Sequence, residues 1–346
     1  MTARQICKEA RVFFLIAKAH SFPATVYLLQ IPVSSSHIRL IGWPLLIIFD
    51  CYLLDIESSR HTNRLLSTHA FNNISLKINS MSPNFYNPIS DNHTTDHWLD
   101  FTLIVPLCTV GNVGQLACDL LISTLLNKKS CKLVGRIWSP ALMPVVGPNA
   151  YDDFDDPPFK QPTTSTEVYE SVAKKLVIIQ QRTSYFKDLK HLYIKDFVQW
   201  VQECRFSNVI VLTSSFAQCN PDTEHLGQQT TIPYYIVTEN SKSTGQLQSL
   251  NLKHVPTEKE SSALRNGLTY LPGSGLTKLL IEAFDKSHIP ATFLVQFCSE
   301  GENTQDAYVM ADVVDRLLSL DIQDQHRSIG ASCDNWVEPH SWRHNC

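Results

Sequence analysis

Short apolar runs and amphipathic stretches alternate along the chain from residue 98 onward. The apolar runs have the length of strands and are not interrupted by regular polar positions: Phe101–Val105, Leu133–Trp138, Leu176–Gln181, Val209–Leu212, Tyr234–Val237 and Ala291–Phe297. Apolar residues at helical spacing predict helices over Val113–Leu126, His191–Cys204, Thr277–Phe284 and Thr304–Leu320. Buried strands interleaved with helices predict an α/β fold, a single layered domain with a largely parallel central sheet flanked by helices.

Finer expectations follow from the same pattern. Glu167–Ser171 and Leu176–Gln181 are close enough to form a hairpin. The polar stretches 139–166 and 238–262 predict surface loops. The helix over 191–204 is expected to direct four apolar side chains inward: Leu192, Phe197, Trp200 and Val201.

The first 80 residues differ from the rest in both charge and pattern. They carry a net charge of +4 and the remainder −8, within a total of −4. They show no clear helical or strand periodicity, and the composition changes near Met81. We therefore expect an N-terminal leader over 1–80 that is disordered or extraneous, a linker over 81–97, a domain over 98–325 and a C-terminal tail over 326–346. The apolar run Ile41–Phe49 is about half of the roughly 20 residues that a membrane span needs, so a membrane tether is only an alternative hypothesis.

Composition excludes some classes of protein. A net charge of −4 and a pI near 6.3 provide no basic surface for nucleic acid. Ten cysteines are scattered without a Cys-x-x-Cys pair, and several lie in apolar segments. This pattern favours reduced thiols packed in a core over a disulfide framework.

Two glycine turns are the candidates for ligand chemistry. The first, Gly111-Asn112-Val113-Gly114, joins a predicted strand to a helix but lacks the third glycine of a dinucleotide fingerprint. The second, in Pro272-Gly273-Ser274-Gly275, precedes Thr277-Lys278, which reverses the Lys-Ser/Thr order of a phosphate loop. Structural turns are favoured at both places, with Gly114 letting the helix pack close to the sheet. A nucleotide- or nucleoside-handling enzyme that uses these turns is the alternative.

No other segment predicts a catalytic centre. Thr213-Ser214-Ser215 end a predicted strand, where a nucleophile could lie, but no partner is marked beyond the sequence neighbours Asp222 and His225. Outside the tail, the histidines show no clustering along the sequence. The tail offers four potential zinc ligands at spacings that match no common site, which favours a loosely ordered tail: Cys333, His340, His344 and Cys346. We expect no catalytic residues, no cofactor and no metal.

Several segments together resemble the proteasome assembly chaperone 2 family. The most specific is FTLIVPLCTVGNVGQLACDLLISTL, Phe101–Leu125. The others follow in the order of the family: LMPVVGPNAY (Leu142–Tyr151), EVYES with KKLVIIQQR (Glu167–Arg182), NVIVLTSS (Asn208–Ser215), LPGSGLTKLL (Leu271–Leu280), FCSEGENTQDA (Phe297–Ala307) and WVEPHSW (Trp336–Trp342). Residues 1–80 lie outside the resemblance.

The resemblance implies a non-enzymatic α/β protein. It implies a heterodimer with a proteasome assembly chaperone 1 homologue, which scaffolds the α-ring of the 20S proteasome from α-type subunits in cytoplasm and nucleus. The hydrophobic-Tyr-x end by which some members dock into the ring is not matched by Arg343-His344-Asn345-Cys346. Our prediction for the partner contact is that the two glycine turns lie at neighbouring strand ends and form one surface: Gly111, Asn112, Val113, Gly114, Pro272, Gly273 and Gly275.

Overall fold

The computed structural model divides the chain into two compact units, Met1–Pro83 and Asn84–Cys346. The structure describes residues 11–17, 26–32, 84–90, 92–151, 162–221, 232–256, 271–323, 329–330 and 335–343. In the first unit, strands β1 (Arg11–Ala17) and β2 (Val26–Pro32) pair antiparallel, which the sequence pattern did not predict. The run Ile41–Phe49 lies outside the described residues. No helix among those described is long and apolar enough to span a membrane.

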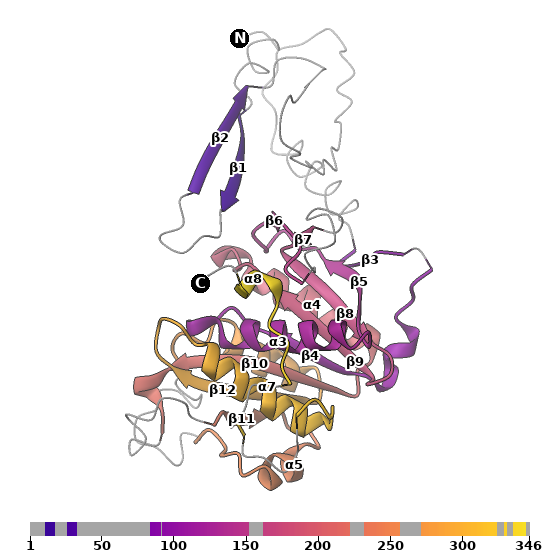
Figure 1. Cartoon of the computed structure of the whole chain (residues 1–346), viewed down its shortest axis with the longest axis vertical. Coiled ribbons are helices and arrows are strands. Elements are labelled where there is room, and N and C mark those ends of the chain that lie inside the picture. Colours follow the sequence, from indigo (N-terminus) through magenta and orange to yellow (C-terminus); the bar gives the residue numbers. More distant parts are fainter. Residues whose placement is uncertain are drawn as a thin grey trace. The chain divides into compact units, whose positions relative to one another are not determined.

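The second unit is built on an eight-stranded sheet with the order β11-β12-β10-β4-β9-β8-β5-β3 (Figure 1). The four central strands β12, β10, β4 and β9 run parallel, and antiparallel strands extend the sheet on both sides. The α/β prediction with a parallel centre is confirmed, and so is the β8–β9 hairpin. The strand bounds are β3 Tyr86–Pro88, β4 Thr102–Pro106, β5 Lys132–Ile137, β8 Thr166–Ser171, β9 Leu176–Gln181, β10 Asn208–Phe216, β11 Tyr234–Val237 and β12 Ala291–Cys298.

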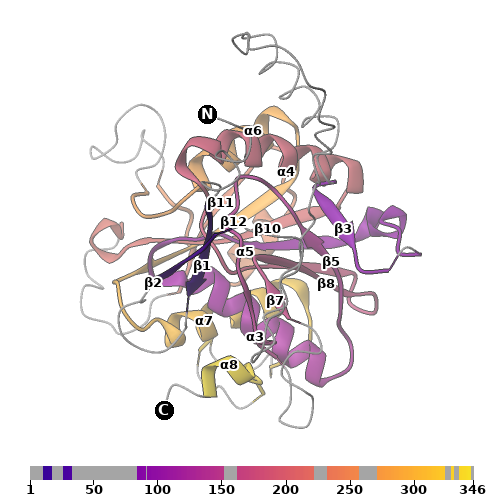
Figure 2. The ribbon, with the colours of Figure 1, turned by 90° about the horizontal axis from the view of Figure 1, so that it is seen from above.

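Helices cover both faces of this sheet (Figure 2). α3 (Val113–Asn127) and α7 (Thr304–Leu318) pack together on one face, and α4 (Lys190–Cys204) and α6 (Thr277–Lys286) on the other. Successive residues of the strands point to opposite faces. In β4, Leu103 and Val105 therefore join the core under α4 and α6, while Ile104 joins the core under α3 and α7. Burial on both faces explains why the central strands appear in the sequence as continuous apolar runs.

Residues 84–90 and 92–97 belong to the fold, although the sequence predicts a linker there. β3 lies in this segment and pairs with β5, followed by the 3-10 helix η1 (Asp96–Asp100). The Tyr86 ring lies 5.4 Å from that of Trp98 and 5.9 Å from that of Trp200, between ring centroids. Trp200 and the pairing strand β5 are distant in sequence, which is why a local pattern could not identify the strand.

Three further expectations are corrected. Part of the polar stretch 238–262 forms the short helix α5 (Thr244–Ser249), anchored by the buried Leu247. Leu192 is 38% exposed because the buried stripe of α4 begins one residue later, at Tyr193. The segment 335–343 is not loosely ordered: it ends in α8 (His340–Arg343), and Trp336 is buried with its Nε1 donating to Asp312 Oδ1 (2.8 Å). Cys333, His344 and Cys346, three of the four candidate zinc ligands, lie outside the described residues.

Candidate contact surface at the strand ends

The two glycine turns contact each other at the carboxyl ends of the central strands. The Val110 amide donates a hydrogen bond to the Gly273 carbonyl (3.0 Å). A Cβ placed on Gly275 would lie 2.5 Å from the Cys108 carbonyl oxygen. The two turns therefore lie side by side at the carboxyl end of β10, as expected, and their joint role as a partner contact stays a prediction. We call residues 110–114 and 271–275, with residues 213–216 of β10, the strand-end cluster.

Gly111 and Gly114 have different tasks in the first turn. Gly111 has φ +69° and Asn112 φ 52°, so both occupy the left-handed region that turns the chain from β4 into α3. Gly114 has an ordinary φ, but a Cβ there would lie 2.5 Å from the Leu212 carbonyl oxygen of β10. The close approach of helix to sheet predicted at Gly114 is confirmed.

The hydroxyls at the end of β10 hold both turns in place. Ser214 Oγ donates to the Val110 carbonyl of the first turn, and Ser215 Oγ to the Pro272 carbonyl of the second (2.8 Å). Thr213 Oγ1 bonds Thr277 Oγ1 at the start of α6 (2.6 Å). All three residues are fully buried, and among the described residues their hydroxyls bond to Thr109, Thr277 and backbone carbonyls rather than to a histidine or a carboxylate. They serve as structural ties, and Asp222 and His225 lie outside the described residues.

The glycines of the cluster accommodate protein atoms rather than a phosphate. A Cβ on Gly111 would lie 2.6 Å from Asn303 Nδ2 and 2.8 Å from Cys298 Sγ. The amides of Val110 and Asn112 already donate to the carbonyls of Gly273 and Thr109. A phosphate loop needs such amides free to face its ligand. The arrangement therefore disfavours the nucleotide-handling alternative.

Thiols beside the cluster are held in their neutral form. Burial raises the pKa of Cys108 to about 12, against an opposing hydrogen bond from Gln181. Burial likewise raises the pKa of Cys298 to about 11. Because only the thiolate is an effective nucleophile, neither thiol is activated. Cys298 is a buried core residue, as the sequence predicted, whereas Cys108 is half-buried. All six cysteines within the described ranges are free.

Only part of the predicted contact set reaches the surface. Asn112, Gly273 and Gly275 are exposed, while Val113 and Gly114 are buried. Gly111 and Pro272 are half-buried. The loop after β12 borders Gly111 through Asn303, whose Nδ2 donates to the Gly301 carbonyl (3.0 Å), and it exposes Glu300 and Glu302. The surface thus consists of the backbone of the two turns and the side chain of Asn112, bordered by the acidic side chains Glu300 and Glu302.

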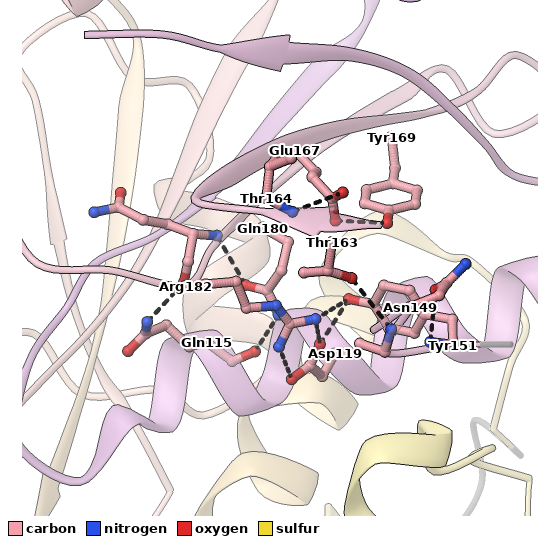
Figure 3. A network of polar contacts seen from close by, with 12 residues as sticks. Gln115, Asp119, Asn149, Tyr151, Thr163, Thr164, Glu167, Tyr169, Gln180 and Arg182 are labelled. Carbon is pink, nitrogen blue, oxygen red and sulfur yellow. Dashed lines mark hydrogen bonds and ion pairs between the residues drawn. The ribbon is translucent and has the colours of Figure 1, made fainter. Parts of the chain in front are cut away.

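A buried ion pair fixes the excursion after β5 to the helix that follows the first turn (Figure 3). Arg182 at the end of β9 donates through both terminal nitrogens to Asp119 of α3 (2.7 and 2.8 Å). Tyr151, within the stretch between β5 and β8, donates its hydroxyl to Asp119 Oδ1 (2.6 Å). Removing one partner of such a buried pair typically costs about 3–5 kcal/mol. The network holds β9, α3 and the stretch that contains Tyr151 together.

Sequence reasoning missed one cluster elsewhere in the fold. We found no grouping of histidines outside the tail, and this is wrong: His93 and His97 lie beside Glu170 of β8, with their ligand atoms within 4.8 Å of one another. The partner carboxylate lies more than 70 residues downstream of both. The His-x-x-x-His spacing was the only signal that could have pointed to it.

A family model described as the PAC2 family matches residues 103–326 of the chain. Among curated proteins, proteasome assembly chaperone 2 of Xenopus tropicalis is 32% identical over 247 residues, which covers 70% of this chain and 90% of that protein. Proteasome assembly chaperone 2 of Nematostella vectensis is 34% identical over 225 residues (64% and 90%). The human protein of the same name is 30% identical over 246 residues (70% and 90%).

Among solved structures, the chain is similar to the crystal structure of Pyrococcus furiosus PbaA, described as an archaeal homolog of proteasome-assembly chaperone. The TM-score is 0.48 at 16% identity, over 69% of this chain and 83% of that one.

Proposed function

The chain belongs to the PAC2 family, and we propose that it is a non-enzymatic proteasome assembly chaperone. The observation that carries this proposal is the identity of 30–34% to proteins named proteasome assembly chaperone 2 over 90% of their length. The name of these relatives describes a role without catalysis. The buried and hydrogen-bonded hydroxyls at the end of β10 are consistent with such a role.

The finer proposal concerns partners and place. The chain pairs with a proteasome assembly chaperone 1 homologue, and this heterodimer promotes assembly of the 20S α-ring from α-type subunits in cytoplasm and nucleus. The family resemblance supports this assignment. The exposed part of the strand-end cluster is the contact that we propose for a partner, because two loops and the start of a helix converge there at the carboxyl ends of central strands.

Affinity capture followed by mass spectrometry tests the proposal. The tagged full chain, expressed in eukaryotic cells, is expected to retain α-type proteasome subunits and a chaperone 1 homologue. A chain that begins at Met81 keeps all of the Asn84–Cys346 unit, so we expect it to retain the same partners. Recovery of a monomer that ignores both classes of partner would refute the chaperone role, and loss of partners only in the shorter chain would refute our view of residues 1–80.

A further inference from the structure

Three side chains with metal-binding atoms converge at the side of the sheet formed by β3, β5 and β8. His93 and His97 come from the segment that precedes β4, and Glu170 from β8. The two imidazoles lie with their ring centroids 5.6 Å apart. Two neutral imidazoles and one carboxylate are a ligand set that Zn²⁺ accepts in proteins.

Glu170 is the buried centre of this group. Its side chain is only 1% exposed, and Trp98 Nε1 donates to its Oε1 (2.7 Å). His97 Nε2 also contacts Oε1, and Lys132 Nζ lies 3.5 Å from Oε2. These contacts hold the Glu170 carboxylate in a fixed position facing both imidazoles.

His93 Nε2 lacks a hydrogen-bond partner although it is buried. It lies 3.6 Å from Glu170 Oε1, beyond hydrogen-bond distance, on a side chain that is 11% exposed. A buried ring nitrogen without a hydrogen-bond partner is energetically unfavourable. Because this nitrogen faces a carboxylate, it is a candidate ligand for a cation.

The other nitrogen of His93 has partners that leave Nε2 free to act as a ligand. Burial raises the pKa of Tyr86, so its hydroxyl keeps its proton. That hydroxyl donates to the Val134 carbonyl (3.3 Å), and its oxygen can then accept from His93 Nδ1–H at 3.2 Å. In this tautomer the lone pair of Nε2 points to Glu170. Metal-binding histidines almost always have such an outer hydrogen bond on the second nitrogen.

We propose that His93 Nε2, His97 Nε2 and Glu170 Oε1 bind one Zn²⁺ ion. In a tetrahedral site with ligand distances of about 2.0–2.1 Å, neighbouring ligand atoms are roughly 3.3 Å apart, which agrees with the 3.6 Å between His93 and Glu170. His97 is 41% exposed, so its ring can move outward to the same separation and water can supply the fourth ligand. Lys132, 65% exposed, can swing into solvent when the ion binds.

The ion joins the segment before β4 to strand β8. This segment contains β3 and η1, the part of the fold that no local sequence pattern predicted. Zinc binding then stabilises the association of this segment with the sheet, independently of any partner of the strand-end cluster.

Titration of the metal-free full chain with ZnCl₂ tests the proposal, with affinity followed by calorimetry and stability by the melting temperature. The wild-type chain is expected to bind zinc and melt at a higher temperature with it. His97→Gln, a change at a half-exposed side chain, is expected to lose one equivalent of zinc or to weaken its binding by about 100-fold or more. Glu170→Gln is expected to do the same.

Two controls separate this site from other ligands. His344→Ala combined with Cys346→Ala removes two possible ligands in the tail, and His191→Gln changes an exposed histidine on α4. Both variants are expected to keep the equivalent of bound zinc that His97→Gln loses. With Co²⁺ in place of zinc, this equivalent is expected to show d–d bands without thiolate-to-cobalt charge transfer. No zinc binding by the wild type, equal binding in His97→Gln, or loss of the equivalent in the tail variant would each overturn the proposal.

Discussion

Gly114 is the residue on which the close packing of α3 against the sheet depends most directly. A Cβ there would lie 2.5 Å from the Leu212 carbonyl oxygen, and backbone atoms cannot give way as a flexible side chain can. We expect Gly114→Ala to lower the free energy of unfolding by about 1–3 kcal/mol. Equilibrium denaturation by urea measures the change.

The matched control is Gly245→Ala in α5. No atom lies within 4 Å of a Cβ added there. Because alanine favours helix over glycine, the change is expected to be neutral or stabilising by up to about 1 kcal/mol. Equal effects of the two substitutions would mean that α3 does not need its close approach to β10.

Asp306 makes the stability of α7 depend on pH. Burial raises its pKa from 3.8 to about 6, against a hydrogen bond from Gln296. The protonated Asp306 carboxyl is therefore more stable in the folded state than in the unfolded chain. Its protonation stabilises the fold below pH 3.8, and this stabilisation is lost as the pH rises through about 6.

Asp306→Asn removes this loss. We expect the melting temperature of the variant to exceed that of the wild type by about 2–4 °C near pH 7.5, and the difference to shrink towards pH 4. Glu300→Gln, which neutralises an exposed carboxylate in the preceding loop, is expected to leave the profile unchanged. A constant difference between Asp306→Asn and wild type at every pH contradicts this account.

Single-residue roles were predictable only where the local chain dictates them. The corner at Gly111 and Gly114 follows from the change of a strand into a helix within a few residues. The ties made by Ser214 and Ser215 do not, because their acceptors at Val110 and Pro272 are far away in sequence. From the sequence alone, Ser214 and Ser215 could only be considered as possible nucleophiles, and their structural role could not be predicted.

At the scale of elements, burial on both faces made the central strands predictable, since each is a continuous apolar run. Edge strand β3 was not predictable, because three residues are too few for a period and its stability comes from Trp98, Trp200 and β5. The same edge holds the His93–His97–Glu170 group, which sequence reasoning missed because Glu170 lies more than 70 residues downstream of both histidines.

The paired turns are elements whose proposed role can be tested with one exposed residue. Asn112→Lys places a long charged side chain on the strand-end cluster without entering the core. We expect it to reduce the amount of α-type subunits or chaperone 1 homologue retained by the chain about tenfold, or 1.4 kcal/mol of binding. Quantitative mass spectrometry of captured proteins measures this.

Asn251→Lys is the matched control for that substitution. Asn251 is also an exposed asparagine in the left-handed region, with φ 57° against 52° for Asn112. It follows α5, apart from the turns, and it is expected to leave partner capture unchanged. Equal capture by both variants would place the contact elsewhere on the molecule.

At the scale of the whole molecule, the ordered set of segments indicated the family, and the match over residues 103–326 confirms it. The α/β class followed from the hydrophobic pattern alone. The hydrophobic pattern could not identify the proposed partner surface. That surface consists largely of turn backbone, and glycines such as Gly273 and Gly275 have no side chain that would indicate a contact.

The most direct test of the chaperone proposal is the rate of α-ring formation. Separately purified α-type subunits are mixed with and without the full chain and its chaperone 1 homologue, no nucleotide is added, and native mass spectrometry counts the rings over time. We predict that the pair increases the rate and yield of rings and that Asn112→Lys removes most of the increase. Ring formation that is unchanged by the pair, or that responds only when a nucleotide is added, would contradict a non-enzymatic assembly chaperone.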